Sequence, residues 1–171
     1  SKRFQQERFI LSQLLVMVLK GVPAFYLPAL LGSENDIKRF SMTGERRDLN
    51  REKFDFEKLL IQLENKNSIA NKNIRILSKA MKIRSKFKSF HPSAKMKCLT
   101  KGRRDIVAIQ RGLENSSIFA IHNITDNKLN FSIDDSLKSS LDDIFIYCDY
   151  LSGKKYKNLN FVLEPFEVLW I

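Results

Sequence analysis

The chain has 171 residues, and its 30 lysines and arginines outnumber 19 aspartates and glutamates to give a formal net charge of +11. Its 43% hydrophobic and 29% charged residues are typical of a folded protein and exclude a disordered polymer. The longest apolar run, residues 14–19, is far shorter than the roughly 20 residues that cross a bilayer, so we expect no membrane partner. Charged first residues without a secretory leader, and only two cysteines, predict a cytoplasmic protein with reduced thiols.

The first predicted element is a helix over residues 4–20, where apolar residues recur at three- and four-residue spacing. We expect Gly21 to end it and Pro23 to block its continuation. A short apolar strand over residues 24–27 and a turn over 32–35 follow. A helix followed by a short buried strand is typical of the end of an α/β repeat, and such a strand needs neighbours on both sides. Because the chain opens with Ser inside the predicted helix, we expect its natural start to lie upstream.

Residues 37–50 are polar without a sustained period and predict a long loop. A short helix is expected within residues 50–64, capped by Asn50 or Asp55. The clearest helical pattern covers residues 68–90. The apolar stripe expected to be buried on this helix is Ile69, Ile76, Ala80, Ile83, Phe87 and Phe90.

After Pro92 the pattern changes to short β-rich runs separated by turn residues. These runs are residues 106–109, 118–121, 129–133, 144–147, 159–163 and 166–170. Short strands at this spacing predict an antiparallel sheet or a small sandwich. The fold class expected is therefore α/β plus all-β, with an α/β part over residues 1–91 and a β-domain over residues 95–171.

Several stretches carry a family resemblance. Near the start are Gly21-Val22-Pro23-Ala24-Phe25-Tyr26, Leu30-Leu31-Gly32-Ser33-Glu34-Asn35-Asp36 and Thr43-Gly44-Glu45-Arg46-Arg47-Asp48-Leu49-Asn50-Arg51-Glu52. At the end are Leu151-Ser152-Gly153 and Leu163-Glu164-Pro165-Phe166-Glu167-Val168-Leu169-Trp170. Together, in this order, they resemble the sucrose phosphorylase and glucosylglycerate phosphorylase branch of glycoside hydrolase family 13, the α-amylase superfamily.

The resemblance implies the last βα repeat of a TIM (β/α)8 barrel, with strand 8, an acceptor loop and the last helices, followed by a C-terminal β-domain. Such enzymes transfer a glucosyl unit between a sugar or glycerate and phosphate with retention. Retaining chemistry uses two carboxylates roughly 5 Å apart, one as nucleophile and one as acid/base. The resemblance places both upstream of residue 1, so we expect no catalytic residue in this chain and no activity from it alone. The implied partners are a sugar or sugar-acid substrate, inorganic phosphate and the N-terminal part of the same barrel, with no cofactor.

For substrate binding, the resemblance matches Arg47 to the family's acceptor-subsite arginine. A planar guanidinium is suited to this task because its fork of N–H groups can hold phosphate oxygens or sugar hydroxyls in a fixed geometry. Arg46 beside it either shifts the match by one place or adds a second charge, which would favour a glycerate acceptor. Asn35 and Asp36 either position a hydroxyl or cap a turn. The alternative for Arg47 is an ordinary solvated loop.

Two other functions remain open. One is an α-amylase-family glycosidase that hydrolyses its substrate. The other is a basic nucleic-acid-binding module, because thirteen basic residues and no acidic residue lie between Glu64 and Asp105. Its candidate face is Lys72, Arg75, Lys79, Lys82 and Lys86. We favour a solvated helix face, and so expect no nucleic-acid partner, because no stacking aromatic residues interleave these cations. The histidines and cysteines are scattered over different predicted elements, so no metal site is expected.

Overall fold

A computed structural model describes residues 3–51, 53–100, 102–112, 116–133 and 146–171. The chain divides into two compact units. The first joins Ser1–Pro23 to Lys79–Ile171, and the second is Ala24–Ser78. The expected division into a barrel part and a β-domain near residues 91–95 stays a prediction, because it concerns a barrel of which this chain is expected to hold only the end.

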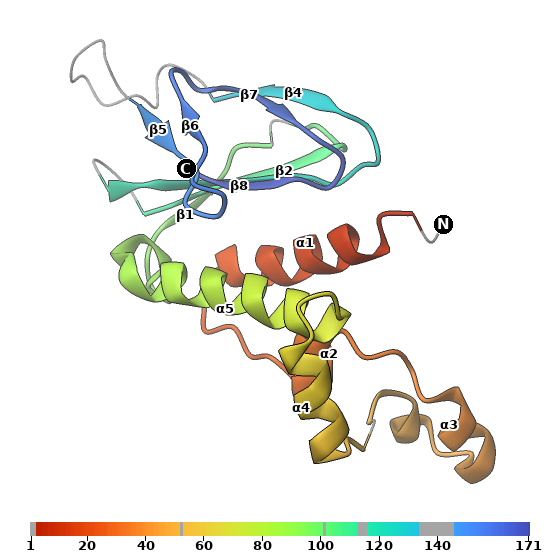
Figure 1. Cartoon of the computed structure of the whole chain (residues 1–171). Coiled ribbons are helices and arrows are strands. Elements are labelled where there is room, and N and C mark those ends of the chain that lie inside the picture. The colour runs from red at the N-terminus through yellow and green to blue at the C-terminus, as the bar shows by residue number, and fades with distance from the viewer. Residues whose placement is uncertain (1–2, 52, 101, 113–115, 134–145) are drawn as a thin grey trace. The chain divides into compact units, whose positions relative to one another are not determined.

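Figure 1 labels the five α-helices and most of the strands among the described residues. The described helices are α1 (Gln5–Val18), α2 (Leu27–Leu31), α3 (Ile37–Thr43), α4 (Phe56–Glu64) and α5 (Ile69–Lys86), with two short 3-10 helices, η1 (Arg46–Asn50) and η2 (Lys88–Phe90). The described strands are β1 (Met96–Cys98), β2 (Ile106–Arg111), β3 (Ile118–Asn123), β4 (Leu129–Ser132), β5 (Tyr147–Cys148), β6 (Lys155–Tyr156), β7 (Asn160–Leu163) and β8 (Val168–Trp170). Predictions of α1, α4, α5 and most strands are confirmed to within a few residues.

The end of α1 is stabilised by two arginines that lie far away in the sequence. The helix ends at Val18, with no basic residue in its last turn. Arg111 from β2 donates to the Val18 carbonyl at 3.0 Å, and Arg84 from α5 donates to the Gly21 carbonyl at 2.8 Å. Each guanidinium also donates at 2.7 Å to a carbonyl of residues 90–91. Because a helix C-terminus carries partial negative charge, these two cations stabilise it and tie it to the chain that follows α5.

The predicted strand over residues 24–27 is absent. Tyr26 has an extended backbone, but α2 begins at the next residue, with Pro28 in its first turn, where proline is tolerated. None of the described strands pairs with this segment, and a buried parallel strand is stable only between neighbours. The segment therefore has the apolar sequence of a strand without the partners that would make it one.

Within the second unit, the end of α2 packs directly on the first turns of α5. Gly32 ends α2 in the left-handed conformation, at φ +72°, with its N–H directed at the Ala29 carbonyl. A Cβ at this position would lie 2.2 Å from Asn73 Nδ2 and 3.2 Å from Ile69 Cγ2. The close approach of the two helices therefore requires glycine here.

The prediction of a long loop over residues 37–50 is wrong, since α3 and η1 occupy this segment. Asp36 caps α3 by accepting the Arg39 N–H at 2.9 Å. Gly44, at φ +68°, ends the helix and donates its N–H to the Phe40 carbonyl at 2.8 Å. No residue of α3 is buried, so no apolar period marks it in the sequence. The helix is specified by its two ends.

The sequence predicts the cap of α4 correctly, but it predicts only part of the buried face of α5. Asp55, one of the two expected caps, accepts the Lys58 N–H at 3.1 Å. The expected apolar stripe on α5 is wrong in its first half, because Ile69 and Ile76 are 58% and 36% exposed. The buried residues of α5 are Ala70, Asn73, Leu77 and Ala80, and Ala80 alone among them belongs to the expected stripe. The stripe was misplaced because this face includes a polar residue, Asn73, which hydrophobic periodicity cannot reveal.

All described strand pairs are antiparallel, which confirms the prediction for this part of the chain. One sheet has the order β1-β2-β3-β8, and two smaller sheets are β4-β7 and β5-β6. The pairing of β2 with β3 runs from Ile106 opposite Asn123 to Arg111 opposite Ile118. β1 and β6 were not predicted, because they are very short and have no buried alternation. Residues 144–145 of the predicted strand 144–147 lie outside the described residues.

The core of the first unit lies between the larger sheet and the β4-β7 pair, as in a small sandwich (Figure 1). The core residues come from the strands of both sheets and from positions directly next to those strands. They are Leu99, Ile106, Ala108, Phe119, Ile121, Phe131, Ile133, Leu159, Phe161, Leu163, Leu169 and Ile171. At the other face, Phe90 packs on Trp170 with ring centroids 4.9 Å apart. Both rings are buried, so the chain after α5 is anchored on β8.

A buried carboxylate organises the turn that contains the Leu151-Ser152-Gly153 motif. Asp149 is 1% exposed. It accepts the N–H groups of Leu151, Ser152 and Trp170 at 3.1, 2.9 and 2.8 Å, and the Ser152 hydroxyl as well. Because every hydrogen-bonding position of the carboxylate is used, the turn is fixed to β8.

Candidate functional site

The two motif stretches before and after α3 lie side by side in the second unit. The Asp36 N–H, just before α3, donates to the Leu49 carbonyl in η1 at 2.8 Å. This bond brings Asn35 and Asp36 next to the turn that carries Arg46 and Arg47. The structure thus gathers the four residues predicted to bind substrate into one region of the second unit.

Asp36 and Asn35 both take part in the geometry of the turn. The Asp36 carboxylate accepts the Arg39 N–H and caps α3, which was one of the two roles expected for it. The Asn35 carbonyl accepts the Ile37 N–H at 3.0 Å, and the Asn35 side chain is exposed. Hydroxyl binding by these two residues stays a prediction.

The turn η1 is held against α3 by one carboxylate. Asp48 Oδ1 lies 2.9 Å from Arg39 Nε in an ion pair, and Asp48 Oδ2 accepts the Thr43 hydroxyl at 2.7 Å. The Thr43 oxygen in turn accepts the Glu45 N–H at 3.2 Å, and the Asp48 N–H donates to the Glu45 carbonyl at 2.9 Å. We call Arg39, Thr43 and Asp48 the η1 anchor. These bonds connect the first and last turns of α3 to η1.

The contacts of the anchor also favour the charged form of Asp48. The hydrogen bond from Thr43 is the largest cause that holds the pKa of the Asp48 carboxyl below its usual range. The hydrogen bond and charge of Arg39 act in the same direction, with a further contribution from the charge of Arg51, while partial burial opposes them. Asp48 is therefore an anion whose two oxygens are both engaged.

Arg46 and Arg47 project from this turn into solvent. Both are exposed, and neither guanidinium has a hydrogen bond or ion pair within the described part of the chain. Two free cations on adjacent residues of a fixed turn can bind an anion or a ring of hydroxyls, because the planar N–H forks need no rearrangement of local ion pairs. The turn thus has the chemistry expected of an oxyanion or sugar contact.

The sequence motif indicates Arg46 and Arg47, but it does not indicate the η1 anchor that holds their turn. Thr43 and Asp48 were part of the quoted motif, yet nothing in the motif shows that their side chains meet. Arg39 lies outside it. The signal that could have found α3 is the pair of ends, Asp36 before the helix and Gly44 after it. The Thr43–Asp48 bond follows only once that helix brings its last turn beside η1.

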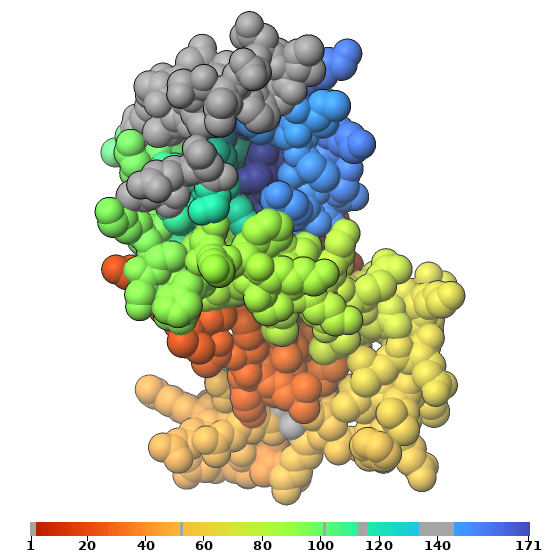
Figure 2. Space-filling view, turned by 90° about the vertical axis from the view of Figure 1, so that its left-hand side faces the viewer, coloured from red at the N-terminus to blue at the C-terminus, as the bar shows by residue number. Residues whose placement is uncertain are grey.

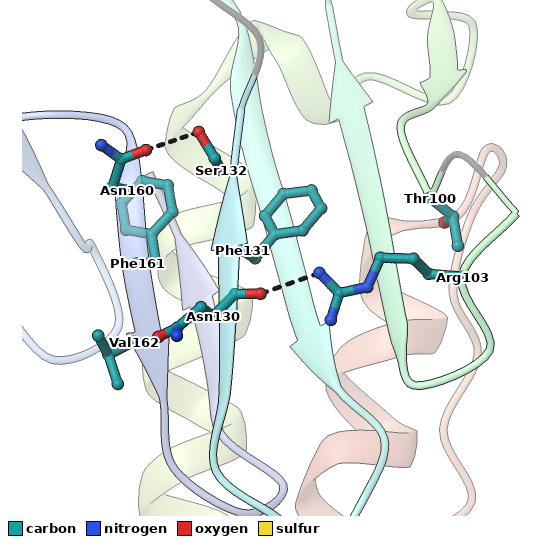
Figure 3. Close-up of a pocket in the computed structure, with 8 residues that line it drawn as sticks. All are labelled: Thr100, Arg103, Asn130, Phe131, Ser132, Asn160, Phe161 and Val162. Carbon is teal, nitrogen blue, oxygen red and sulfur yellow. Dashed lines mark hydrogen bonds between the residues drawn. The ribbon is translucent and has the colours of Figure 1, made fainter.

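A separate pocket of about 530 Å³ lies in the first unit, on the β-domain. Figure 3 shows its lining, in which Arg103 Nη1 donates to the Asn130 carbonyl at 2.9 Å and the Ser132 hydroxyl donates to Asn160 Oδ1 at 2.6 Å. Arg103 is also held by both oxygens of Asp105, at 2.8 and 2.6 Å. The Arg103 guanidinium is thus already neutralised by Asp105. Its bond to the Asn130 carbonyl covers the edge of β4 that does not pair with β7.

The basic face of α5 does not form a free row of cations. Lys79, Lys82 and Lys86 are exposed, and Figure 2 shows this part of the helix at the surface of the molecule. Lys79, however, donates to the Leu151 carbonyl, and Lys72 is partly buried. The interpretation of this row as a solvated helix face stays a prediction, as does the absence of a nucleic-acid partner.

The remaining cysteines, histidines and carboxylates that the structure describes are not grouped into a second site. Both cysteines are free thiols, with Cys98 exposed and Cys148 partly buried. Among the described residues, no group of three or more histidines, cysteines and carboxylates is arranged to hold a metal ion. None of the described helices combines the length and the hydrophobicity that a membrane-crossing segment requires.

No family model matches the chain. Curated relatives do: glucosylglycerate phosphorylase of Allomeiothermus silvanus is 27% identical over 164 residues, which cover 96% of this chain and 26% of the relative. The enzyme of the same name from Escherichia coli is 24% identical, over 96% of this chain and 28% of its own length. The chain is similar to the C-terminal part of glucosylglycerate phosphorylases. It spans about a quarter of the length of these relatives.

Solved structures support the fold. Bacillus licheniformis trehalose-6-phosphate hydrolase matches with a TM-score of 0.67 and 12% identity, over 98% of this chain and 39% of that one. A trehalulose synthase matches with a TM-score of 0.72 and 9% identity, over 99% of this chain and 39% of that one. These neighbours are TIM-barrel enzymes of glycoside hydrolase family 13. The described helices and antiparallel sheets fit the end of such a barrel and the domain that follows it. The resemblance found in the sequence is confirmed by the curated relatives, which match over 96% of the chain.

Proposed function

We propose that the chain is the C-terminal part of a retaining α-glucoside phosphorylase of the glucosylglycerate type. The observation that carries this proposal is the similarity to glucosylglycerate phosphorylases over 96% of the chain. In the complete enzyme, the two carboxylates of retaining chemistry lie in the part that precedes this chain. The chain then supplies a wall of the substrate site and a β-domain beside the barrel.

Within that enzyme, η1 contributes to the site for phosphate and acceptor. In barrel enzymes the substrate lies where loops leave the C-terminal ends of the strands, and residues 27–51 follow Ala24-Phe25-Tyr26, the segment matched to the last strand. The exposed guanidinium of Arg47 is the group proposed to hold phosphate oxygens or acceptor hydroxyls. Its lack of a protein partner among the described residues supports this role.

Arg46 is the residue proposed to favour glycerate over fructose as the acceptor. Glucosylglycerate has a carboxylate where sucrose has a neutral fructosyl group. A second exposed cation beside Arg47 therefore adds attraction for the first donor and little for the second. The sucrose-type phosphorylase is the alternative within the same branch, and hydrolysis is the alternative reaction of the superfamily.

The test is phosphorolysis by the complete enzyme, with glucosylglycerate and sucrose as donors measured side by side. We expect glucosylglycerate to be preferred, and Arg46→Asn to reduce that preference. Arg47→Ala should lower phosphate use more than donor hydrolysis, because a charged hydrogen bond of about 1.5–3 kcal/mol corresponds to roughly one to two decades in rate. A preference for sucrose that Arg46→Asn leaves unchanged would favour the alternative. Hydrolysis without any dependence on phosphate would contradict the phosphorylase assignment.

A further inference from the structure

We propose that the η1 anchor of Arg39, Thr43 and Asp48 positions the Arg47 guanidinium for phosphate or acceptor. The inference rests on the proposed function of Arg47. It assigns a role to three residues that do not themselves touch the substrate, and it makes Asp48 a positioning residue whose effect passes through its neighbour in the chain.

The first support is that η1 is tied to α3 at two successive residues. Asp48 binds Arg39 and Thr43 through its carboxylate, and the Leu49 carbonyl accepts the Asp36 N–H. Arg47 directly precedes this pair of attachments. The backbone from which its side chain leaves therefore has little freedom, and less conformational entropy is lost when the guanidinium binds a ligand.

The second support is the helix to which η1 is attached. α3 spans Ile37–Thr43 and is capped at its start by Asp36 and at its end by Gly44. Arg39 and Thr43 are one turn apart on this helix, and the Thr43 oxygen also lies 3.1 Å from the Arg39 carbonyl. Two points on one short, doubly capped helix give the Asp48 carboxylate a defined position and direction.

The third support is electrostatic. A carboxylate beside two arginines would ordinarily compete with phosphate for their N–H groups. Here both Asp48 oxygens are engaged, one by Arg39 and one by Thr43. The anchor thus keeps the neighbouring guanidiniums available to an incoming anion, which is the state that the structure shows for Arg46 and Arg47.

Thr43 offers a matched pair of variants for the test, because its side chain is exposed and its removal leaves no cavity. Thr43→Val keeps the shape but loses the hydroxyl, whereas Thr43→Ser keeps the hydroxyl. In the complete enzyme, we expect Thr43→Val to raise the KM for inorganic phosphate by roughly two- to tenfold, which is less than the full effect of losing a hydrogen bond to a carboxylate because phosphate feels the loss only through Arg47. The ratio of phosphorolysis to donor hydrolysis should fall accordingly, and Thr43→Ser should restore both values.

The double variant Arg47→Ala with Thr43→Val separates positioning from a general effect on the fold. If the anchor acts through Arg47, adding Thr43→Val to Arg47→Ala should cause no further loss of phosphate use. Additive losses, or phosphorolysis and hydrolysis falling in parallel in Thr43→Val, would overturn the inference. A loss in Arg47→Ala with none in Thr43→Val would also overturn it while leaving the proposed function intact. If Arg47→Ala itself leaves phosphate use unchanged, the proposed function of the turn fails instead.

Discussion

At the scale of single residues, burial alters the chemistry of His122. The side chain lies on β3, fully buried, with Nδ1 3.3 Å from the Val107 carbonyl. Its Nε2 has no hydrogen-bond partner within the described part of the chain. Burial lowers the pKa of His122 to about 4, because protonation would place a charge in an apolar sheet, and the hydrogen bond to Val107 opposes the shift only in part.

This pKa predicts an acid-sensitive stability. In the unfolded chain the imidazole gains its proton near pH 6.5, whereas in the folded chain it does so only near pH 4. Between these values the unfolded state binds more protons, so stability should decrease as the pH falls from about 6.5 to 4, by on the order of 3 kcal/mol in total. Denaturant unfolding of the 171-residue chain across this range measures the effect.

His122→Asn is the matched control, because an amide can still donate to the Val107 carbonyl but does not titrate. The difference between the pH profiles of the two proteins isolates the contribution of this histidine from that of the carboxylates. Parallel profiles would show that His122 is not the group responsible.

At the scale of elements, the contact between α2 and α5 depends on the absence of one side chain. Gly32 needs both a left-handed backbone and the space occupied by Asn73. Gly44 has a similar backbone, at φ +68°, but no atom lies within 4 Å of a Cβ built there. The two glycines therefore separate the cost of conformation from the cost of packing.

We expect Gly32→Ala to destabilise the protein more than Gly44→Ala. The second change should cost about 1–2 kcal/mol, for the left-handed conformation alone. The first should cost roughly 1–3 kcal/mol more, because the methyl group must displace Asn73 or shift α2. Thermal unfolding of both variants measures the difference, and equal losses would show that the α2–α5 contact is looser than the structure indicates.

These elements also show what the sequence can predict. α1 buries one regular face, so its periodicity is visible, whereas β2 and β3 are buried at nearly every position and are marked by continuous apolar runs rich in β-branched residues. The segment 24–27 was misread because its strand-like sequence has no partner here, and α3 was missed because its two caps, not its faces, define it. In the candidate site, Arg46 and Arg47 follow from the motif. The Asp48 anchor does not, since it depends on side chains that meet only after α3 has formed.

At the scale of the whole molecule, we expect the isolated chain to show no phosphorolysis of glucosylglycerate or sucrose. The nucleophile and the acid/base carboxylate of the proposed enzyme are both expected outside it. The measurement is release of glucose 1-phosphate by the purified 171-residue chain. The complete enzyme, assayed at the same concentration, is the positive control. Product formation by the isolated chain would refute our placement of the reacting groups.

The bonds from Arg84 and Arg111 to the end of α1 and the residues after it have a consequence for folding during synthesis on the ribosome. Within this chain α1 is translated before the segments that complete it, since Arg111, which binds the Val18 carbonyl at its end, follows 93 residues later. The pairing of β3 is in turn complete only after Ile171 has been synthesised, because the N–H and carbonyl of Ile171 both pair with Phe119. A helix of this length is marginal in water on its own, and the contacts that this chain supplies to the end of α1 form only after Arg111 has emerged. The end of α1 is thus completed only by strands that are made later, and premature termination before Arg111 should release a chain that chaperones and proteases recognise as unfinished.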